Sequence, residues 1–389
     1  MIAALPWPPN AAVLARNALS LRRDRPWKGY AGRSAPRLLG LAEAALGWIA
    51  RSQDQVGSGG VGDFRFQGWT PGYPEVTGYI IPTMFDWAER LGRDELRERA
   101  LRMAEWELGI QQPGGGFESW YEGEGRPPVV FNTGQVIRGL VRAAAETGDE
   151  RFLAGALRAG EWIIDGQEPD GSFSKGNYLG MTRVYDVYST ASLAQLAVAS
   201  GDDRFGRAAI ANAEFAISKQ TPEGWFDLCD NVPAGNATPS THTLGYTADG
   251  LIEIGATLGE PDLLTAGELT ARALLAAVEP GGRLPGRFDR DWNPAAGYVV
   301  LTGSAQLGIL LAGIHAREPE PGPKLLEGAW SLLDFVAYCQ RLNAVGANRR
   351  GAIAGSYPIW GRYVPLKYPS WATKFYLDQI RLLLAISSE

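Results

Sequence analysis

The stretch "WELGIQQPGGGF" (residues 106–117) runs from an apolar, helix-like segment into a Gln, a Gly-rich turn and an aromatic residue. The chain repeats this stop as "WIIDGQEPDGSF" (162–173) and "FAISKQTPEGWF" (215–226). The same place is taken by Gln53, Glu279 and Gln340, so that successive stops lie 53 to 61 residues apart. Self-similarity at a nearly fixed period indicates a repeat architecture, here of six units.

Each unit contains two helical patterns. The first ends at the stop, and its apolar residues recur every three or four positions between charged ones, as expected of an amphipathic helix. These segments are 37–53, 94–111, 149–167, 203–220, 261–279 and 323–340. The second pattern is more apolar and richer in small residues, which predicts helices covered on most sides. These segments are 76–92, 132–148, 186–201, 242–259, 301–314 and 370–386.

Twelve helices in six outer-inner hairpins predict an all-α fold, the (α/α)6 toroid. An open solenoid is the alternative, but six units that close on themselves need no terminal caps. We expect one toroid domain over residues 36–389, preceded by an irregular, Arg-rich lead-in over residues 1–35. Thr-Gly or Ser near the start of the inner segments suits close backbone packing and N-capping.

Composition narrows the classes of function. The hydrophobic content of 45% is enough for a large core, and the net charge of −6 gives no basic footprint for nucleic acid. No apolar run approaches the roughly 18 residues of a membrane span, and the N-terminus lacks the order of a secretory signal. With two cysteines there is no disulfide framework, so a cytoplasmic location is expected. The oligomeric state is left open.

The helix hairpins give the fold a polarity. Short connections such as "ETGDERF" (146–152) lie on one face, and the long connections from each stop to the next inner helix lie on the other. Long loops in a compact domain are usually functional, and six helix N-termini at one mouth favour an anionic ligand. We therefore expect the main cleft at the N-terminal ends of the inner helices.

Polar and aromatic side chains gather where the inner helices begin. Glu75 and Asp186 can be helix-start carboxylates or acid/base groups, and His242, Tyr246 and Tyr368 are further proton-transfer candidates. The predicted substrate-binding residues are those whose rings stack on sugars or whose polar groups bind hydroxyls and carboxylates. They are Tyr79, Asn132, Gln135, Tyr185, Tyr188, Arg287, Asp289, Gln306, Trp360, Arg362, Tyr363, Lys367, Trp371 and Lys374.

The last long connection concentrates positive charge in an acidic protein. The segment 342–371 contains Arg349, Arg350, Arg362 and Lys367 and no acidic residue. It is either a solvated loop or a clamp for carboxylate or phosphate groups.

A metal site has little support. Asp227, Cys229 and His242 are the only candidate set, and a zinc site wants three or four ligands in a defined geometry. We expect neither a metal nor a cofactor, and we interpret His315, at the tail of an inner segment, as structural.

The stops "QQPGGGF", "QEPDGSF" and "QTPEGWF" resemble the repeat turns of squalene cyclases and prenyltransferases. The Asp-x-Asp-Asp acid of squalene-type cyclases is absent, and "DRDW" (289–292) is the nearest string. The segments "YPEVTGYIIPT", "FNTGQVIRGLVRA", "LPGRFDRDWNPAAGYVVLTGSAQ" and "GSYPIWGRYVPLKYPSWATKFYLDQI" resemble toroid proteins of exopolysaccharide biosynthesis clusters and, more faintly, the C-terminal helical domain of glucuronyl C5-epimerases. This second resemblance covers residues 36–389 and implies a glycan context.

The favoured function is a carbohydrate-active enzyme acting on an anionic, uronate-type sugar or glycan by C5-epimerisation or β-elimination. Both reactions begin with removal of the proton α to a carboxylate, and they need a base, an opposing acid and cations. The alternatives are an inverting glycoside hydrolase with two carboxylates from Glu75, Asp186, Asp289 and Asp291, a terpenoid cyclase-like enzyme, and a non-catalytic glycan-binding scaffold.

Overall fold

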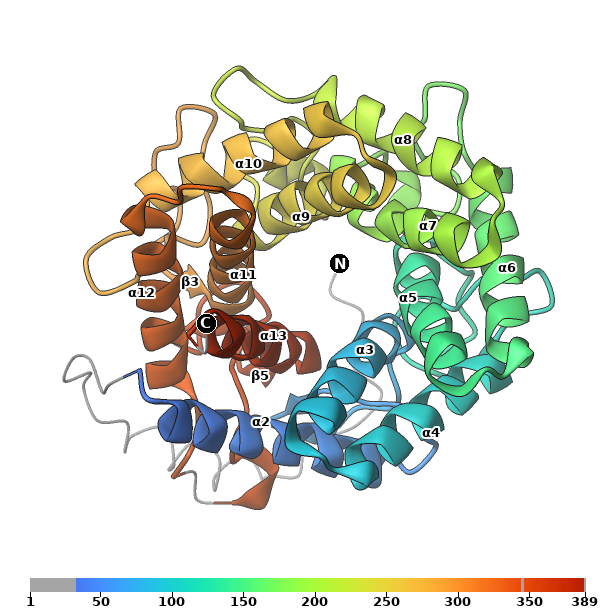
Figure 1. Cartoon of the computed structure of the whole chain (residues 1–389), viewed down its shortest axis with the longest axis horizontal. Helices are drawn as coiled ribbons and strands as arrows, with labels where there is room; N and C mark the ends of the chain where they lie inside the picture. Colours follow the sequence, from blue (N-terminus) through green and yellow to red (C-terminus); the bar gives the residue numbers. More distant parts are fainter. Residues whose placement is uncertain (1–32, 344–345, 388–389) are drawn as a thin grey trace.

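Two concentric rings of α-helices make up this computed structural model, which describes residues 33–343 and 346–387 (Figure 1). The outer helices are α2 (Ala35–Val56), α4 (Asp94–Ile110), α6 (Glu150–Asp165), α8 (Asp203–Ile217), α10 (Pro261–Ala276) and α12 (Pro323–Cys339). The inner helices are α3 (Pro74–Leu91), α5 (Val130–Thr147), α7 (Val187–Ser200), α9 (Thr241–Leu258), α11 (Leu301–Arg317) and α13 (Ser370–Ile386).

The rings are closed. Each inner helix packs against the next one along the chain, and the last inner helix, α13, packs against both α3 and α2. The prediction of an (α/α)6 toroid is therefore confirmed, and the open solenoid is wrong. The predicted lead-in lies almost entirely outside the described residues. None of the described helices is both long and apolar enough to cross a bilayer.

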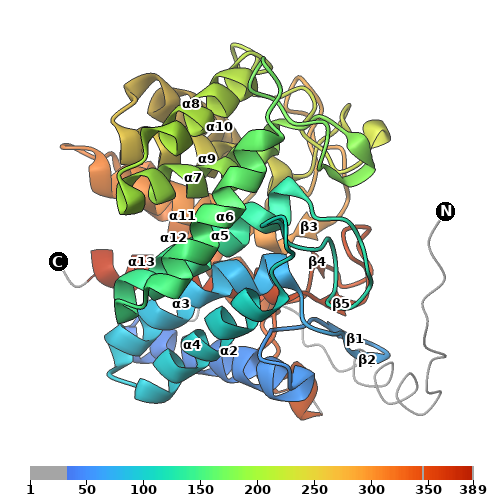
Figure 2. The ribbon, with the colours of Figure 1, turned by 90° about the vertical axis from the view of Figure 1, so that its right-hand side faces the viewer.

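Short strands occur in the long connections, which gather at one end of the toroid (Figure 2). β1 (Phe64–Arg65) pairs in antiparallel fashion with β2 (Gly68–Trp69) and with β5 (Lys367–Tyr368). β3 (Val299–Val300) pairs in the same way with β4 (Ser356–Tyr357). The β1–β5 register sets Arg65 opposite Lys367, so the first and last long connections lie side by side.

The repeated Gln binds each unit to the next. The Nε2 of Gln111 donates to the carbonyl oxygens of Gly115, in its own turn, and of Gly155, in the next outer helix. Gln167 repeats this arrangement with Gly171 and Ala208. A carboxylate cannot donate in this way, and Glu279 instead pairs with Arg283. The stop therefore recurs because one side chain secures both a turn and a contact between units.

Gln340 closes the circle. Its buried Nε2 donates to the carbonyl oxygen of Leu41, in α2, at 2.9 Å and to that of Gly351 at 3.1 Å. We expect Gln340→Ala to lower the free energy of unfolding by about 2–3 kcal/mol, because two buried carbonyl groups lose their donor. Urea unfolding measures this change. Gln112→Ala is the control, since Gln112 is only partly buried and makes one long bond. Equal losses in the two variants would contradict the closing role.

The Thr-Gly pairs in the inner helices do not act as N-caps. A Cβ atom on Gly78 would lie 2.7 Å from backbone atoms of Gln135 and Val136, so this glycine lets α3 and α5 approach closely. The Oγ1 of Thr77 accepts from the backbone N–H of Val61, and the Oγ1 of Thr133 accepts from that of Phe117. These threonines therefore attach the incoming long connection to the inner ring, and the expected N-capping is wrong for them.

Candidate functional site

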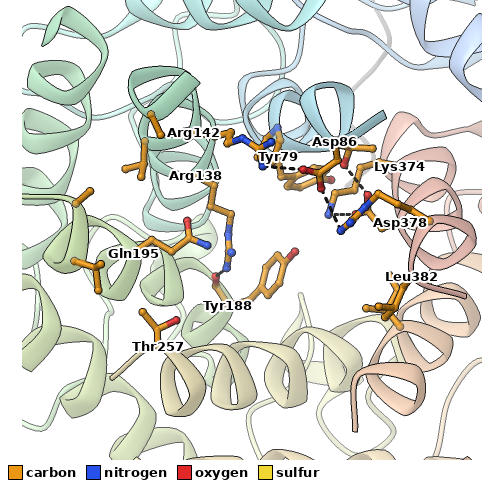
Figure 3. Close-up of a pocket in the computed structure, with 18 residues that line it drawn as sticks. Tyr79, Asp86, Arg138, Arg142, Tyr188, Gln195, Thr257, Lys374, Asp378 and Leu382 are labelled. Atoms are coloured by element: carbon orange, nitrogen blue, oxygen red, sulfur yellow. Dashed lines mark hydrogen bonds and ion pairs between the residues drawn. The ribbon is translucent and has the colours of Figure 1, made fainter. Parts of the chain in front are cut away.

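Two cavities enter the inner ring from opposite ends. The first, of about 350 Å³, lies among the long connections and the N-terminal ends of the inner helices. The second, of about 540 Å³, lies in the half of the ring nearer the short connections (Figure 3). The expectation that the main cleft lies at the N-terminal ends is therefore wrong as to size. Long loops mark one end of the toroid, but the volume of each cavity depends on how far the side chains at the centre fill the ring.

A single layer of rings separates the two cavities. The ring of Tyr246 lies 4.5 Å from that of Tyr188 and 4.2 Å from that of His242, centroid to centroid. Phe375 contacts the ring of Tyr79 at 5.8 Å and that of Tyr246 at 5.9 Å. His242 and Tyr246 line the first cavity, while Tyr79 and Tyr188 line the second.

Aromatic side chains from several units wall the first cavity. Trp120 and Tyr178 come from the second and third long connections, and their rings meet edge to face at 6.0 Å. Tyr363 and Trp371 come from the last connection and the start of α13, and the Trp371 indole donates to the Tyr363 hydroxyl at 3.0 Å. Such walls suit a ligand with flat apolar faces and polar edges.

Glu75 is the acidic residue of the first cavity. It occupies the first turn of α3, and the hydroxyl of Tyr73 donates to its Oε2 at 2.7 Å. Burial raises the pKa of Glu75 to about 7, although Tyr73, Lys367 and Arg183 oppose the shift. Among the described residues that line this cavity, no other is acidic. A carboxyl group that is half-ionised near neutral pH can both accept and donate a proton.

The raised pKa has a consequence for stability. The folded-state pKa of about 7 exceeds the ordinary value of 4.5, so folding strengthens proton binding at Glu75. Its stabilising contribution is complete below about pH 4.5 and is lost as the pH rises through 7. We expect the free energy of unfolding of the parent protein, relative to Glu75→Gln, to fall over this window. Denaturant unfolding at several pH values measures the difference, and a constant difference would contradict a raised pKa.

His242 faces the first cavity from the first turn of α9. Its Nδ1 lies 2.7 Å from the Oε1 of Gln306, a buried residue of α11. Burial lowers the pKa of His242 to about 4, so the imidazole is neutral at physiological pH. With the amide oxygen facing Nδ1, the Nδ1 carries the proton and the Nε2 keeps its lone pair. A neutral imidazole in this form is a proton acceptor.

Two buried cations complete the first cavity. The Nζ of Lys367 lies 2.6 Å from the Oδ2 of Asp63, and it donates to the Tyr121 hydroxyl at 3.0 Å. Burial lowers the pKa of Lys367 most, but the Asp63 carboxylate and the Tyr121 hydroxyl together outweigh it, and the pKa is raised overall. Arg183 lies 3.5 Å from the Oδ1 of Asp186 and donates to the Tyr185 hydroxyl. Both cations are thus largely neutralised by fixed carboxylates and present oriented donors rather than free charge.

Eight of the predicted site residues line the first cavity. They are Glu75, Asn132, Tyr185, His242, Tyr246, Tyr363, Lys367 and Trp371. Three others line the second cavity, namely Tyr79, Tyr188 and Lys374. Tyr79 and Lys374 lie more than one turn past the starts of α3 and α13, whereas Tyr188 is the second residue of α7.

The structure does not bring the remaining predicted residues into either cavity. Asp186 is fully buried, where it accepts from Asn177 at 2.6 Å and supports Arg183, and Tyr368 packs in the core against Phe64. Gln135 donates to Ser189, and Gln306 lies behind His242. The other four belong to loops: Arg287 pairs with Asp230, Asp289 accepts from its own turn, and Trp360 and Arg362 are exposed.

The proposed clamp of four cations is not assembled. Arg349 is buried and Arg350 is exposed, and neither they nor Arg362 line the first cavity. Only Lys367 reaches it, because the β1–β5 pairing fixes that stretch of backbone. The candidate metal set also stays apart, since no group of three His, Cys, Asp or Glu side chains suited to a metal occurs among the described residues.

Sequence reasoning missed several residues of the first cavity. Tyr73, Trp120, Tyr178, Arg183 and Asn231 line it. All five lie in long connections, where no helical period fixes the direction of a side chain. The signal that was available is the aromatic residue ahead of an inner helix, as in "ESWYEGEG" and "GNYLG".

Solved structures that resemble the chain include enzymes named for their action on sugars. The chain superposes on an unsaturated glucuronyl hydrolase specific for heparin with a TM-score of 0.73, at 13% identity, over 92% of this chain and 99% of that one. It superposes on cellobiose 2-epimerase from Bacillus thermoamylovorans B4167 with a TM-score of 0.71, at 12% identity, over 89% and 98%. It superposes on a sugar epimerase from a ruminal bacterium with a TM-score of 0.70, at 15% identity, over 89% of this chain and 98% of that one. No protein-family model and no curated protein matches the chain. At these identities the likeness establishes the (α/α)6 toroid fold.

Proposed function

We propose that this protein is a carbohydrate-active enzyme whose substrate carries a uronate-type carboxylate. The observation that carries the proposal is the first cavity, in which Glu75, with a pKa of about 7, shares an aromatic-walled space with His242, Tyr246, Arg183 and Lys367. Aromatic rings stack on the apolar faces of sugars, and amide and charged groups bind their hydroxyls and carboxylates. The sugar-processing enzymes that share the fold support this reading.

The favoured reaction is proton abstraction at C5. Glu75, when ionised, takes the C5 proton, and the electrons of the C–H bond move into the neighbouring carboxylate to form an enediolate. Donors on Lys367 and Arg183 stabilise the negative charge that develops there. Return of a proton to the opposite face, from the Tyr246 hydroxyl, completes an epimerisation. In a β-elimination the enediolate electrons instead form a C4=C5 double bond, the C4–O bond breaks, and the departing oxygen takes a proton from the Tyr246 hydroxyl.

Glycoside hydrolysis is the second candidate. A carboxyl group with a raised pKa is what a general acid for a leaving sugar requires, and Glu75 has one. The usual second carboxylate has no counterpart among the described residues that line the cavity, so water activation falls to neutral His242. The terpenoid alternative is less well supported, because charged groups line the cavity. A binding scaffold would leave the raised pKa of Glu75 without a use.

One experiment separates these reactions. The protein is incubated in deuterated water with glucuronate-containing oligosaccharides and with their neutral counterparts. Deuterium at C5 identifies epimerisation, ultraviolet absorbance of an unsaturated product identifies elimination, and new reducing ends alone identify hydrolysis. We expect exchange at C5 only with the uronate substrates, and none in Glu75→Gln. Turnover of neutral oligosaccharides alone, or none of the three signals across the panel, would contradict the proposal.

A further inference from the structure

We infer that the second cavity is a binding site for a small organic anion, one with a single carboxylate or phosphate group and an apolar part. The cavity has a volume of about 540 Å³. One side, formed by α3, α5 and α13, carries Arg138, Arg142, Lys374 and Arg381 together with Asp86 and Asp378. Figure 3 shows Arg142 directed at Asp86 and Lys374 at Asp378. The proposed function does not use these residues.

A chain of ion pairs runs along the charged side of this cavity and ends at Arg381. Arg97 pairs with Glu146, which also pairs with Arg142 at 2.9 Å. Arg142 pairs with Asp86 at 2.7 Å, and the other oxygen of Asp86 lies 3.1 Å from Arg381. Three guanidinium groups thus share two carboxylates, and the series ends in a cation at both ends. The other two cations of the wall are matched by acids, since Arg138 pairs with Glu253 and Lys374 with Asp378, and the buried Asp249 faces both cations.

Arg381 has donors to spare at the cavity. Its Nη2 takes the bond to Asp86, while its buried Nε has no hydrogen-bond partner among the described residues. The Arg381 side chain as a whole is 38% exposed and only its Nη2 is engaged with Asp86, so the outer edge of the guanidinium is open to an oxygen in the cavity. A guanidinium offers such an oxygen a two-pronged contact. The open position next to Asp86 is therefore shaped for a carboxylate or phosphate.

Lys374 adds a second, deeper cation. Its side chain is about nine-tenths buried, and its Nζ lies 2.8 Å from the Oδ2 of Asp378 and over the ring of Phe375. Arg138, equally buried, is held by both oxygens of Glu253, so it is a structural part of the wall. The negative C-terminal end of a helix repels an anion only near its last turn. Lys374 lies in the first half of α13, away from that end.

The rest of the wall is uncharged. Val198, Thr257 and Ile309 line the side formed by α7, α9 and α11, and Leu382 adds to it from α13. Val198 is 67% exposed, an unusual value for a valine in an inner helix. A sugar acid alone would leave this surface unused, whereas an anion with an apolar body covers it. The stacked rings of Tyr188, Tyr246 and His242 lie between this cavity and the first one.

Calorimetry with three matched probes tests the inference. Phenyl phosphate and benzoate carry the anion on an apolar ring, and benzyl alcohol is the neutral counterpart. We expect at least one of the two anions to bind and the alcohol not to bind, and the tighter anion identifies the head group. Arg381→Gln should weaken anion binding about ten- to a hundredfold, the effect of one charge-assisted contact.

Two control variants decide between outcomes. Arg204→Gln removes an ion-paired arginine of the outer helix α8 and should leave the affinity unchanged. Glu75→Gln should also leave it unchanged, so that failure of the proposed function does not affect this result. The inference is overturned if neither anion binds the parent protein, if benzyl alcohol binds as tightly, or if Arg381→Gln binds like Arg204→Gln.

Discussion

Glu75→Gln should lower kcat on a uronate substrate by about a hundred- to ten thousandfold, the usual contribution of a general acid or base. Gln keeps the size of the side chain and an oxygen for the Tyr73 hydroxyl, so the fold and KM should change little. The measurement is steady-state kinetics, with circular dichroism to verify the fold. Because the pKa of Glu75 is about 7, kcat of the parent protein should change with pH near neutrality. The residual kcat of Glu75→Gln should not show this change.

The matched control is Glu150→Gln. Glu150 also lies in the first turn of a helix, but in the outer ring, where it is exposed. It should retain full activity. A Glu75→Gln variant with parental kcat would remove Glu75 from the chemistry and shift attention to His242 alone.

The second large effect concerns stability. Lys367→Met should lower the free energy of unfolding by about 3–5 kcal/mol, because it leaves a buried carboxylate without its counter-charge. Asp63 is fully buried, and its oxygens accept from the Tyr121 hydroxyl at 3.0 Å and the Ser370 backbone N–H at 2.8 Å in addition to Lys367. Those two bonds cannot replace a positive charge. Urea unfolding at neutral pH measures the loss.

Two further variants show whether the loss comes from the unpaired charge. Arg151→Met breaks an exposed ion pair with Glu105, which solvent screens, and should cost far less than Lys367→Met. Adding Asp63→Asn to Lys367→Met removes the stranded charge and should recover part of the stability. If the double variant is less stable than Lys367→Met by the full cost of a second mutation, packing rather than charge explains the loss.

The toroid could be predicted because its signal is periodic. The recurring Gln marks where each outer helix ends, and the apolar spacing marks where each helix runs. Closure was inferred from the number of units, and the bond from Gln340 to Leu41 shows how it is achieved. The lengths of the connections told which face they share, but not which face holds the larger cavity.

For the site, helical residues were predicted better than loop residues. Glu75, Asn132, His242 and Tyr246 line the first cavity, as expected from their places at the starts of inner helices. Tyr79 lies four residues after Glu75 in α3, on the same helix face but one turn deeper, so it reaches the other cavity. The helical period predicts which face of the helix a residue occupies. It does not predict how far along the helix one cavity ends and the other begins.

Loop residues depend on contacts that are remote in sequence. Arg362 and Lys367 are five residues apart in the same basic stretch, yet one is exposed and the other is buried against Asp63. The difference is made by the pairing of Lys367 with Arg65, some 300 positions earlier in the chain. The sequence of the loop alone does not distinguish Arg362 from Lys367.

The β1–β5 pairing also has a consequence for the synthesis of the protein on the ribosome. The first cavity is begun by Glu75, near the start of the chain, and is completed by Lys367 and Trp371, near its end. A growing polypeptide leaves the ribosome from its N-terminus, and the early hairpins have formed their own local contacts by then. Nascent chains are therefore expected to lack a complete first cavity until α13 has been made, and a chain that stops anywhere before α13 should be without it.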